Sequence, residues 1–321
     1  MAKSNTTPRK ASIDRMALSL ERTLQTASRS ENTIYSYLLS VRLLTGFLAE
    51  RGHDLTVDVP RDDIKDFLIE QQTRRKIVDS LGRVHWGGSP ATALVRYKAL
   101  QQFFKHCVEE GELEVSPMVG IPEPAPEEKP VPIVRDEVLA KLLKARSGKT
   151  FVDRRDTAIM RVFLDTGCRL AEVTNLRIGD VELKEGVLTV TGKGNRLRTV
   201  PIGASTGKAI NSYLLQLEKE QPERADDPSG KLWIGRQGPL STSGVTDVLH
   251  RMCDDAGVAR LHWHQFRHTL AHTWLAHGGT EGDLMSLAGW KSRAMLDRYA
   301  KSAQVERAHA AAKRMTLGDR V

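Results

Sequence analysis

A proline-rich segment near the middle of the chain constrains the fold more than any other feature. Five of the thirteen prolines lie between Pro122 and Pro132, in the sequence PEPAPEEKPVP. Proline fixes φ and lacks a backbone donor, so neither a helix nor a sheet can continue through this segment, which behaves as an extended spacer. At 321 residues the chain suits two domains. We therefore predict a linker at 118–132 between two domains, preceded by a disordered polar lead at 1–11.

Helical periodicity dominates the part before the linker. Apolar residues recur at helical spacing in three stretches that are predicted to be helices, 31–51, 62–75 and 92–110. The segment 81–89, LGRVHWGGS, is rich in glycine and is predicted to be a loop. Residues 12–117 are therefore expected to form an all-α bundle.

The part after the linker mixes helices with one strong hairpin signal. β-rich runs at 186–191 and 196–201 flank a G-K-G-N turn, and glycine and asparagine are typical of tight hairpins. Helical patterns precede this hairpin, and they follow it to the C-terminus apart from loops at 226–230 and 236–243. The prediction for 133–321 is a mixed α+β, mainly helical domain with a small antiparallel sheet.

Charge and cysteine content indicate the kind of partner and the cellular compartment. The chain has 48 Lys+Arg against 40 Asp+Glu and a formal charge of +8, a basic excess that suggests a polyanionic partner without proving one. Its three cysteines form no C-x-x-C pair, which indicates free thiols in a reducing compartment. No apolar run approaches the ~20 residues of a membrane span, and the N-terminus lacks an apolar signal sequence. The expected location is the cytoplasm.

Several residues after the linker suit the handling of a phosphate. Arg169 opens a predicted helix, where free N–H groups and the helix dipole favour an anion, and Glu172 can brace its guanidinium. Lys193 lies in the hairpin turn, where it can donate a proton to a leaving hydroxyl. His264 and Arg267, three residues apart, can address one phosphate together. Each of these residues alone also has an ordinary explanation, such as a surface ion pair or a solvated turn lysine.

Trp290 and Tyr299 extend this set. An indole N–H can donate to a phosphoryl oxygen while its ring packs. A phenol oxygen can attack phosphorus, and a covalent intermediate divides one difficult displacement into two. A tyrosine near a helix end is by default a half-buried core residue, so Tyr299 by itself is not diagnostic.

Two other chemistries are open at this point. His264, His268 and His272 recur every four residues, a spacing found in metal sites. However, Gln265 stands where the metalloprotease motif has glutamate, so packing or hydrogen bonding is the favoured role of His268 and His272. Cys168 is conceivable as a nucleophile, although a buried cysteine usually behaves as a small apolar residue.

Taken in order, the motifs resemble those of the tyrosine site-specific recombinases, the family of phage integrases, Xer proteins and Cre. The sequence reads R-L-x-E from Arg169, G-K-G-N in the hairpin, H-x-x-R-H-T from His264, L-x-G-W ending at Trp290, and Tyr299 nine residues later. A pattern of the family's core-binding domain is matched by Thr33, Tyr37, Val41 and Leu44. The resemblance implies a SAM-like helical core DNA-binding domain at 12–117 and a catalytic domain at 133–321.

The resemblance also implies roles for these residues. Arg169 and Arg267 would clamp the scissile phosphate of DNA and offset charge in the transition state. Lys193 would protonate the leaving 5′ oxygen, and His264 would assist proton removal from the attacking group or orient it. Tyr299 would form a 3′-phosphotyrosyl link, so that neither ATP nor a metal cofactor is needed.

The remaining implications concern Trp290, the partners and the alternatives. Trp290 stands where many members have histidine and Cre-like members have tryptophan, which favours packing and one hydrogen bond over proton transfer. The implied partners are double-stranded DNA and further copies of this chain, with a tail helix around 305–315 docking on a neighbour in a tetramer. A type IB topoisomerase and a non-catalytic DNA-binding protein with the same fold are the alternatives.

Overall fold

The computed structural model describes residues 11–127 except 74, 79–81 and 83, residues 132–290 except 193, and the single positions 293, 296 and 312. The chain divides into two compact units, Met1–Lys129 and Pro130–Val321. The boundary lies inside the segment 118–132, and each unit has its own hydrophobic core. Lys193 and Tyr299 lie outside the described residues. So do the predicted lead and the predicted tail helix, apart from Ala11 and Ala312.

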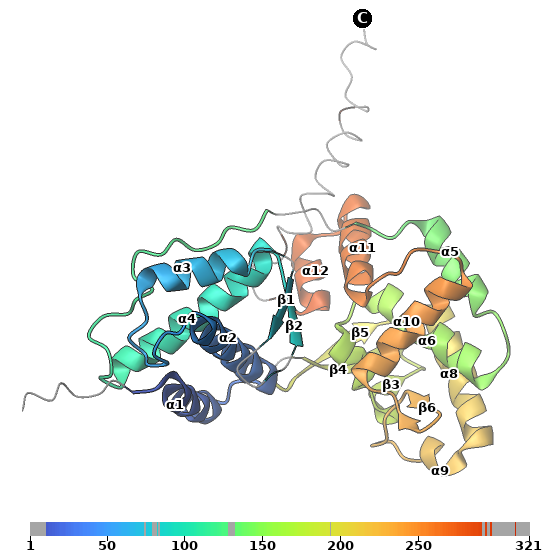
Figure 1. The fold of residues 1–321 in the computed structure, drawn as a ribbon. Helices are drawn as coiled ribbons and strands as arrows, with labels where there is room; N and C mark the ends of the chain where they lie inside the picture. Colours follow the sequence, from blue (N-terminus) through green and yellow to red (C-terminus); the bar gives the residue numbers. More distant parts are fainter. Residues whose placement is uncertain are drawn as a thin grey trace, which may run out of the picture. The chain divides into compact units, whose positions relative to one another are not determined.

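The first unit is a helical bundle with a short hairpin (Figure 1). Its described helices are α1 (Ile13–Thr26), α2 (Glu31–Glu50), α3 (Arg61–Glu70) and α4 (Pro90–Glu109). Helices α2 and α4 pack against each other, and their inward residues Leu44, Leu100 and Phe104 are fully buried. The predicted helices at 31–51 and 92–110 agree with α2 and α4 within two residues, whereas the helix predicted at 62–75 ends at Glu70.

The prediction of a loop throughout 81–89 is wrong. Strand β1 (Arg75–Val78) pairs antiparallel with β2 (Val84–Gly87), so the second half of that segment is a strand. The β-branched and aromatic residues of the two strands favour an extended backbone. Gly82, with φ of 73°, supplies the turn between them. Gly82 is therefore a turn residue, as predicted, whereas Gly87 belongs to the short strand β2, which was missed.

The second unit packs helices around a small antiparallel sheet (Figure 1). The sheet order is β3 (Val181–Glu182), β4 (Val187–Gly192) and β5 (Arg196–Pro201), with Gly192 opposite Arg196 at the hairpin end. Its described helices are α5 (Asp136–Ala145), α6 (Phe151–Thr166), α7 (Leu170–Thr174), α8 (Ala204–Glu220), α9 (Pro222–Ala225), α10 (Thr242–Asp255), α11 (Trp263–Ala276) and α12 (Glu281–Ala288). A 3-10 turn spans Ile178–Asp180. Strand β6 (Ile234–Gly235) pairs with β7 (Gly238–Pro239); β7 lies inside the loop predicted at 236–243, whereas β6 lies just before it, where no strand was predicted.

Helix α6 runs through the core of this unit and sets the start of the site. Its residues Ile159 and Phe163 are fully buried, and the ring of Phe163 stacks on Trp263 of α11 with 3.9 Å between ring centres. The helix ends at Gly167, whose φ of 54° is the left-handed conformation that glycine adopts without strain. A Cβ at Gly167 would lie 2.7 Å from the end of the Leu270 side chain, so Leu270 on α11 would have to move to admit any other residue.

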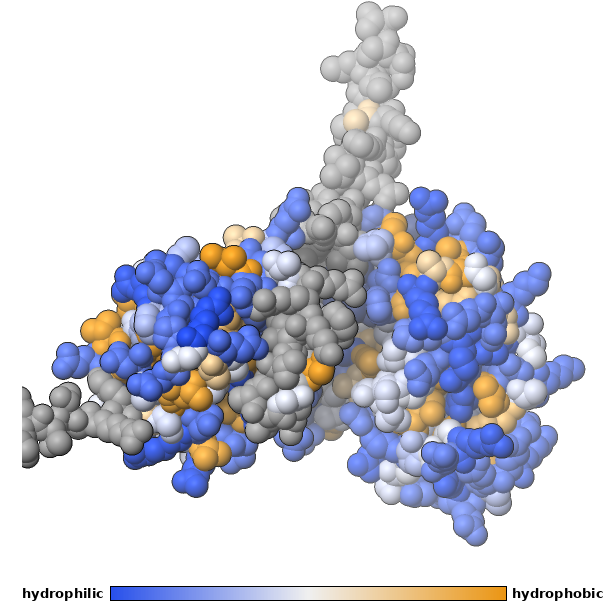
Figure 2. Space-filling view, viewed as in Figure 1, coloured by the Kyte–Doolittle hydropathy of each residue, from blue (hydrophilic) through white to orange (hydrophobic). Residues whose placement is uncertain are grey.

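On the face shown in Figure 2, the described surface is mainly hydrophilic, with apolar side chains scattered in small groups. Of the helices in the described part of the chain, none is both long and apolar enough to cross a bilayer.

Candidate active site

The candidate site lies where three segments of the second unit meet: the α6–α7 junction, the β4–β5 hairpin and the end of α12. Arg169 is the N-cap residue of α7, with φ of −70° and ψ of 150°. Its backbone N–H donates to Oε2 of Glu172 at 2.9 Å, which closes the first turn of that short helix. The left-handed turn at Gly167 and this cap together fix the direction in which Arg169 leaves the backbone.

Glu172 is the anionic centre of the site. It is 5% exposed and accepts hydrogen bonds from Nη1 of Arg169 at 2.9 Å and from Nη1 and Nη2 of Arg198 at 3.0 and 2.8 Å. Burial by itself raises the pKa of this carboxyl, but the hydrogen bonds from Arg198 and Arg169 outweigh it and lower the pKa to about 2. Glu172 is therefore ionised at neutral pH and holds two guanidiniums at a fixed separation.

Arg198 was not among the predicted site residues. It lies on β5, where its Nε donates to the Leu287 carbonyl at 3.2 Å and its Nη2 lies 3.6 Å from Sγ of Cys168. Burial lowers the pKa of Arg198, but the Glu172 carboxylate and Cys168 raise it above its ordinary value. A sequence signal existed, because Arg196 and Arg198 are two apart in a predicted strand and so share one face.

Arg267 is buried and braces two helix ends. It is 3% exposed, and its Nη1 and Nη2 donate to the carbonyls of Gly167 at 2.8 Å and Ala288 at 2.7 Å. These carbonyls lie at the C-terminal ends of α6 and α12, where a carbonyl has no N–H donor within its own helix. The guanidinium carbon also lies 5.0 Å from the ring centre of Trp290, itself 5% exposed in a small apolar cluster with Leu275 and other residues.

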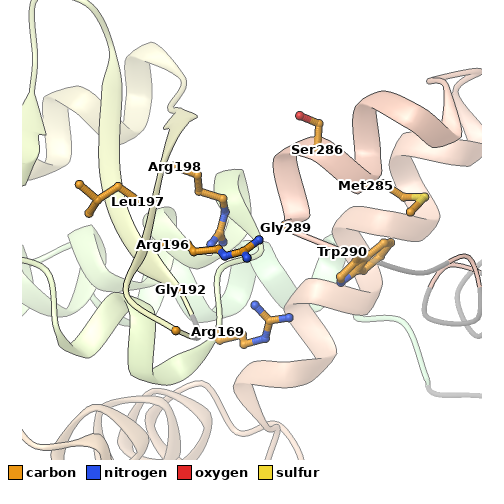
Figure 3. Close-up of a pocket in the computed structure, with 10 residues that line it drawn as sticks. Arg169, Gly192, Arg196, Leu197, Arg198, Met285, Ser286, Gly289 and Trp290 are labelled. Carbon is orange, nitrogen blue, oxygen red and sulfur yellow. The ribbon is translucent and has the colours of Figure 1, made fainter. Parts of the chain in front are cut away.

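A cavity of about 820 Å³ opens beside these groups (Figure 3). The guanidiniums of Arg169, Arg196 and Arg198 approach it from the start of α7 and from β5, and Trp290 lies on the opposite side. Of the described residues that line it, none is acidic: Arg169, Gly192, Gly194, Arg196, Leu197, Arg198, Met285, Ser286, Gly289 and Trp290. The Arg169 side chain is 39% exposed, so it can reach a ligand. The cavity is cationic and suits an anion such as a phosphodiester.

The structure brings most of the predicted residues in its described part together. Arg169 and Trp290 line the cavity, with Glu172 between Arg169 and Arg198. Arg267 is buried against Trp290 and does not itself line the cavity. His264 is exposed at the start of α11, three residues before Arg267, and does not line the cavity.

The two competing chemistries find little support in the geometry. Among the described residues, no three His, Cys, Asp or Glu side chains are grouped to hold a metal ion. The rings of His264 and His268 meet edge to face with 4.7 Å between centres, and His268 and His272 are buried in α11. Cys168 is 2% exposed, and burial raises the pKa of its thiol, which disfavours the reactive thiolate.

Residues 133–306, more than half of the chain, match the phage integrase family. The chain belongs to the phage integrase family. A relative, the tyrosine recombinase XerC of Oceanobacillus iheyensis, is 26% identical over 276 residues, covering 84% of this chain and 85% of that protein. The resemblance to tyrosine recombinases is thereby confirmed, and with it an enzyme that breaks and rejoins DNA.

Two solved structures share the fold. One is the XerH site-specific recombinase in a post-cleavage complex with a palindromic difH substrate, with a TM-score of 0.69, 18% identity, and coverage of 92% of this chain and 84% of that chain. The other is a lambda integrase tetramer bound to a Holliday junction, with a TM-score of 0.63, 15% identity, and coverage of 91% and 82%. The predicted fold class is confirmed.

Proposed function

We propose that this chain is a site-specific DNA recombinase that cuts and rejoins duplex DNA through a covalent bond between Tyr299 and a 3′ phosphate. One observation carries the proposal: a cationic cavity in the family's catalytic region, at which Arg169 is held by a buried carboxylate and Trp290 is held against Arg267. The named recombinases among the relatives support the reaction class.

The chemistry requires stabilisation of charge on a pentacoordinate phosphorus. Arg169 is fixed before the substrate arrives, since the ionised Glu172 holds both its backbone N–H and its guanidinium. Preorganised donors of this kind are worth on the order of 10²–10³-fold in rate each. Arg267 is proposed as the second phosphate ligand, with Trp290 packed against it. His264, at the exposed start of α11, is proposed to orient the attacking group.

The proposed step conserves phosphoester bonds. The Tyr299 hydroxyl gives its proton to His264, and its oxygen forms a bond to phosphorus while the bond from phosphorus to the 5′ oxygen breaks. Lys193 gives a proton to that 5′ oxygen. Attack by the 5′ hydroxyl of another strand then releases the tyrosine and completes a new phosphodiester. Because one phosphoester replaces another at each step, no ATP is consumed.

The other tyrosines support the choice of Tyr299. Tyr213 donates its hydroxyl to the Leu232 carbonyl at 2.8 Å, and burial raises its pKa to about 12. The hydroxyl of Tyr97 is similarly bonded, to the Ile121 carbonyl at 3.0 Å. The hydroxyls of Tyr213 and Tyr97 are therefore hydrogen-bonded within the cores of their units. The other two tyrosines, Tyr35 and Tyr37, lie on α2 of the first unit.

We also propose the partners and the assembly. Residues 12–117 are assigned as the core DNA-binding domain and 133–321 as the catalytic domain, and the basic excess of +8 favours DNA as the substrate. The lambda integrase tetramer on a Holliday junction supports four copies acting on two duplexes. DNA as the substrate and the buried free thiols at 107, 168 and 253 fit the cytoplasm. The relatives named as recombinases favour strand exchange over relaxation by a topoisomerase or DNA binding alone.

The test is covalent capture from a library of nicked duplexes with randomised sequence around the nick. Cleavage beside the nick releases a short fragment, so religation stops and the protein–DNA adduct survives denaturation. The wild-type protein is expected to form the adduct, and Tyr299→Phe to bind the captured sequences without forming it. Tyr213→Phe, which loses two buried hydrogen bonds in the same unit, serves as the matched control and should still react. An adduct formed by Tyr299→Phe would refute the assignment.

A further inference from the structure

Arg198 is the strongest unassigned feature of the site, and its interpretation rests on the proposed function. We propose that Arg198 is a positioning residue, which fixes the Glu172–Arg169 pair against the end of α12 and so sets where Arg169 meets the phosphate.

Arg198 lines the cavity, but each of its guanidinium nitrogens donates to the protein. Its Nη1 and Nη2 both donate to Glu172, at 3.0 and 2.8 Å, and its Nε donates to the Leu287 carbonyl at 3.2 Å. Its side chain is 17% exposed, against 39% for Arg169. All three nitrogens of the guanidinium are thus engaged with the protein, whereas Arg169 shows one guanidinium bond to Glu172 and extends towards the cavity. The two arginines share one carboxylate and line one cavity, but Arg198 is the less exposed and makes more hydrogen bonds to the protein.

Two glycines shape the space around the Arg198 guanidinium. A Cβ at Gly289 would lie 3.3 Å from three of its atoms, and a Cβ at Gly192 would lie 3.3 Å from its Nη1. Gly289 is also the left-handed C-cap of α12, with φ of 63°. The planar group therefore lies in a slot between the hairpin and the end of α12, where a side chain on either glycine would press against it. Such a slot fixes both the orientation and the depth of the guanidinium.

The same slot connects the hairpin to the segment that carries Trp290. Arg198 binds the Leu287 carbonyl and Arg267 binds the next one, at Ala288. Two arginines thus hold the last carbonyls of α12, which are otherwise without intrahelical partners. Arg198 joins α7, β5 and α12 through one planar group, so its loss releases Arg169 and the end of α12 together. A displacement of about 1 Å at a reacting group can cost about 10²-fold in rate.

The experiment uses full-length protein and a nicked duplex whose sequence is taken from the capture library. Two quantities are measured: the single-turnover rate of adduct formation at saturating DNA, and the Kd for intact duplex over a series of salt concentrations. Arg198→Ala is expected to lower the rate about 10²-fold, to change Kd less than about 3-fold, and to leave the salt dependence of Kd unchanged. Arg198→Lys should rescue little, because an ammonium cannot donate as a fork to both carboxylate oxygens.

A double-mutant cycle with Glu172→Gln tests whether Arg198 acts through Glu172. If it does, the double variant should be no more than about 3-fold slower than the slower single variant. Two results together would show that Arg198 binds a phosphate directly and would overturn the positioning role. In the double variant the fold-losses in rate of the two single variants would multiply, and in Arg198→Ala the slope of log Kd against log salt concentration would fall by about 1. Arg260→Ala removes an arginine from an exposed ion pair with Asp254 and is the control expected to behave as wild type.

Folding is checked by thermal melting of each variant. Should Arg198→Ala not fold, Gly192→Ala provides the test, because it places a methyl group against Nη1 while keeping the charge. A slower rate with unchanged Kd supports the proposal, and a wild-type rate overturns it. These outcomes are separate from failure of the proposed function, which would appear as wild-type protein that forms no adduct with any duplex in the library.

Discussion

At the scale of single residues, Glu172 makes a pH-dependent contribution to stability. Its folded-state pKa of about 2 lies below the ordinary value of 4.5, so its ionised form stabilises the fold fully above about pH 4.5. That contribution is lost as the pH falls from 4.5 towards 2. We expect Glu172→Gln to lower the free energy of unfolding by on the order of 3 kcal/mol at pH 7 and by much less near pH 3.

Denaturant titrations at pH 7, 4.5 and 3 on both proteins would measure this. Glu182→Gln, on the exposed strand β3, is the matched control and should differ little from wild type at every pH. An effect of Glu172→Gln that stays constant from pH 7 to 3 would contradict the ionic account.

Arg267 is expected to stabilise the fold as well as the site. Arg267→Met keeps the length of the side chain but leaves the buried carbonyls of Gly167 and Ala288 without these donors. Each unsatisfied buried group costs about 1–3 kcal/mol, so a loss of about 2–5 kcal/mol in urea unfolding is predicted. The same change at Arg260, in an exposed ion pair, should cost less than about 1 kcal/mol. Equal losses in the two variants would contradict the bracing role.

The residues of the site were partly predictable from the sequence. Arg169, Glu172, Arg267 and Trp290 stand in short motifs with fixed spacing, and the structure places them together. Arg198 was missed because its partners are distant in sequence: Glu172 is 26 residues away and Leu287 is 89. Local periodicity carries no information about such contacts. They follow from the register of the hairpin and from the packing of α12.

At the scale of elements, the turn at Gly167 is expected to be intolerant of substitution. Gly167→Ala would place a Cβ 2.7 Å from Leu270 and would strain a residue with φ of 54°. We predict a loss of more than about 1 kcal/mol in thermal or urea unfolding, because the change combines backbone strain with a clash.

Gly207 provides the matched contrast. It lies in the interior of α8, where a Cβ would meet nothing within 4 Å. Gly207→Ala should therefore raise stability by about 0.5–1 kcal/mol, since alanine loses less backbone entropy in a helix. If the two variants changed stability in the same direction, the local conformations described for these glycines would be wrong.

The elements were more predictable where turn chemistry and periodicity agreed. The G-K-G-N turn between two β-rich runs predicted the β4–β5 hairpin, and the apolar stripes predicted α2 and α4. The β1–β2 hairpin escaped because each of its strands is only four residues long, too short for a period-two pattern to stand out from a glycine-rich context.

At the scale of the whole molecule, the two units are expected to survive separation. Each has its own buried core, and most residues from 122 to 127 are exposed. Brief digestion with a glutamate-specific protease should cut first after Glu127, and the C-terminal product should melt cooperatively. Cuts that accumulate equally after Glu21 in α1 or Glu218 in α8 would contradict two independent cores.

The most direct test of the account is to locate the covalent bond by mass spectrometry. The captured adduct is trimmed with nuclease, digested with protease, and searched for a peptide that carries a 3′ nucleotide. We predict that the nucleotide is attached to Tyr299. Attachment to any of the other four tyrosines, or to a serine or cysteine, would contradict the central claim.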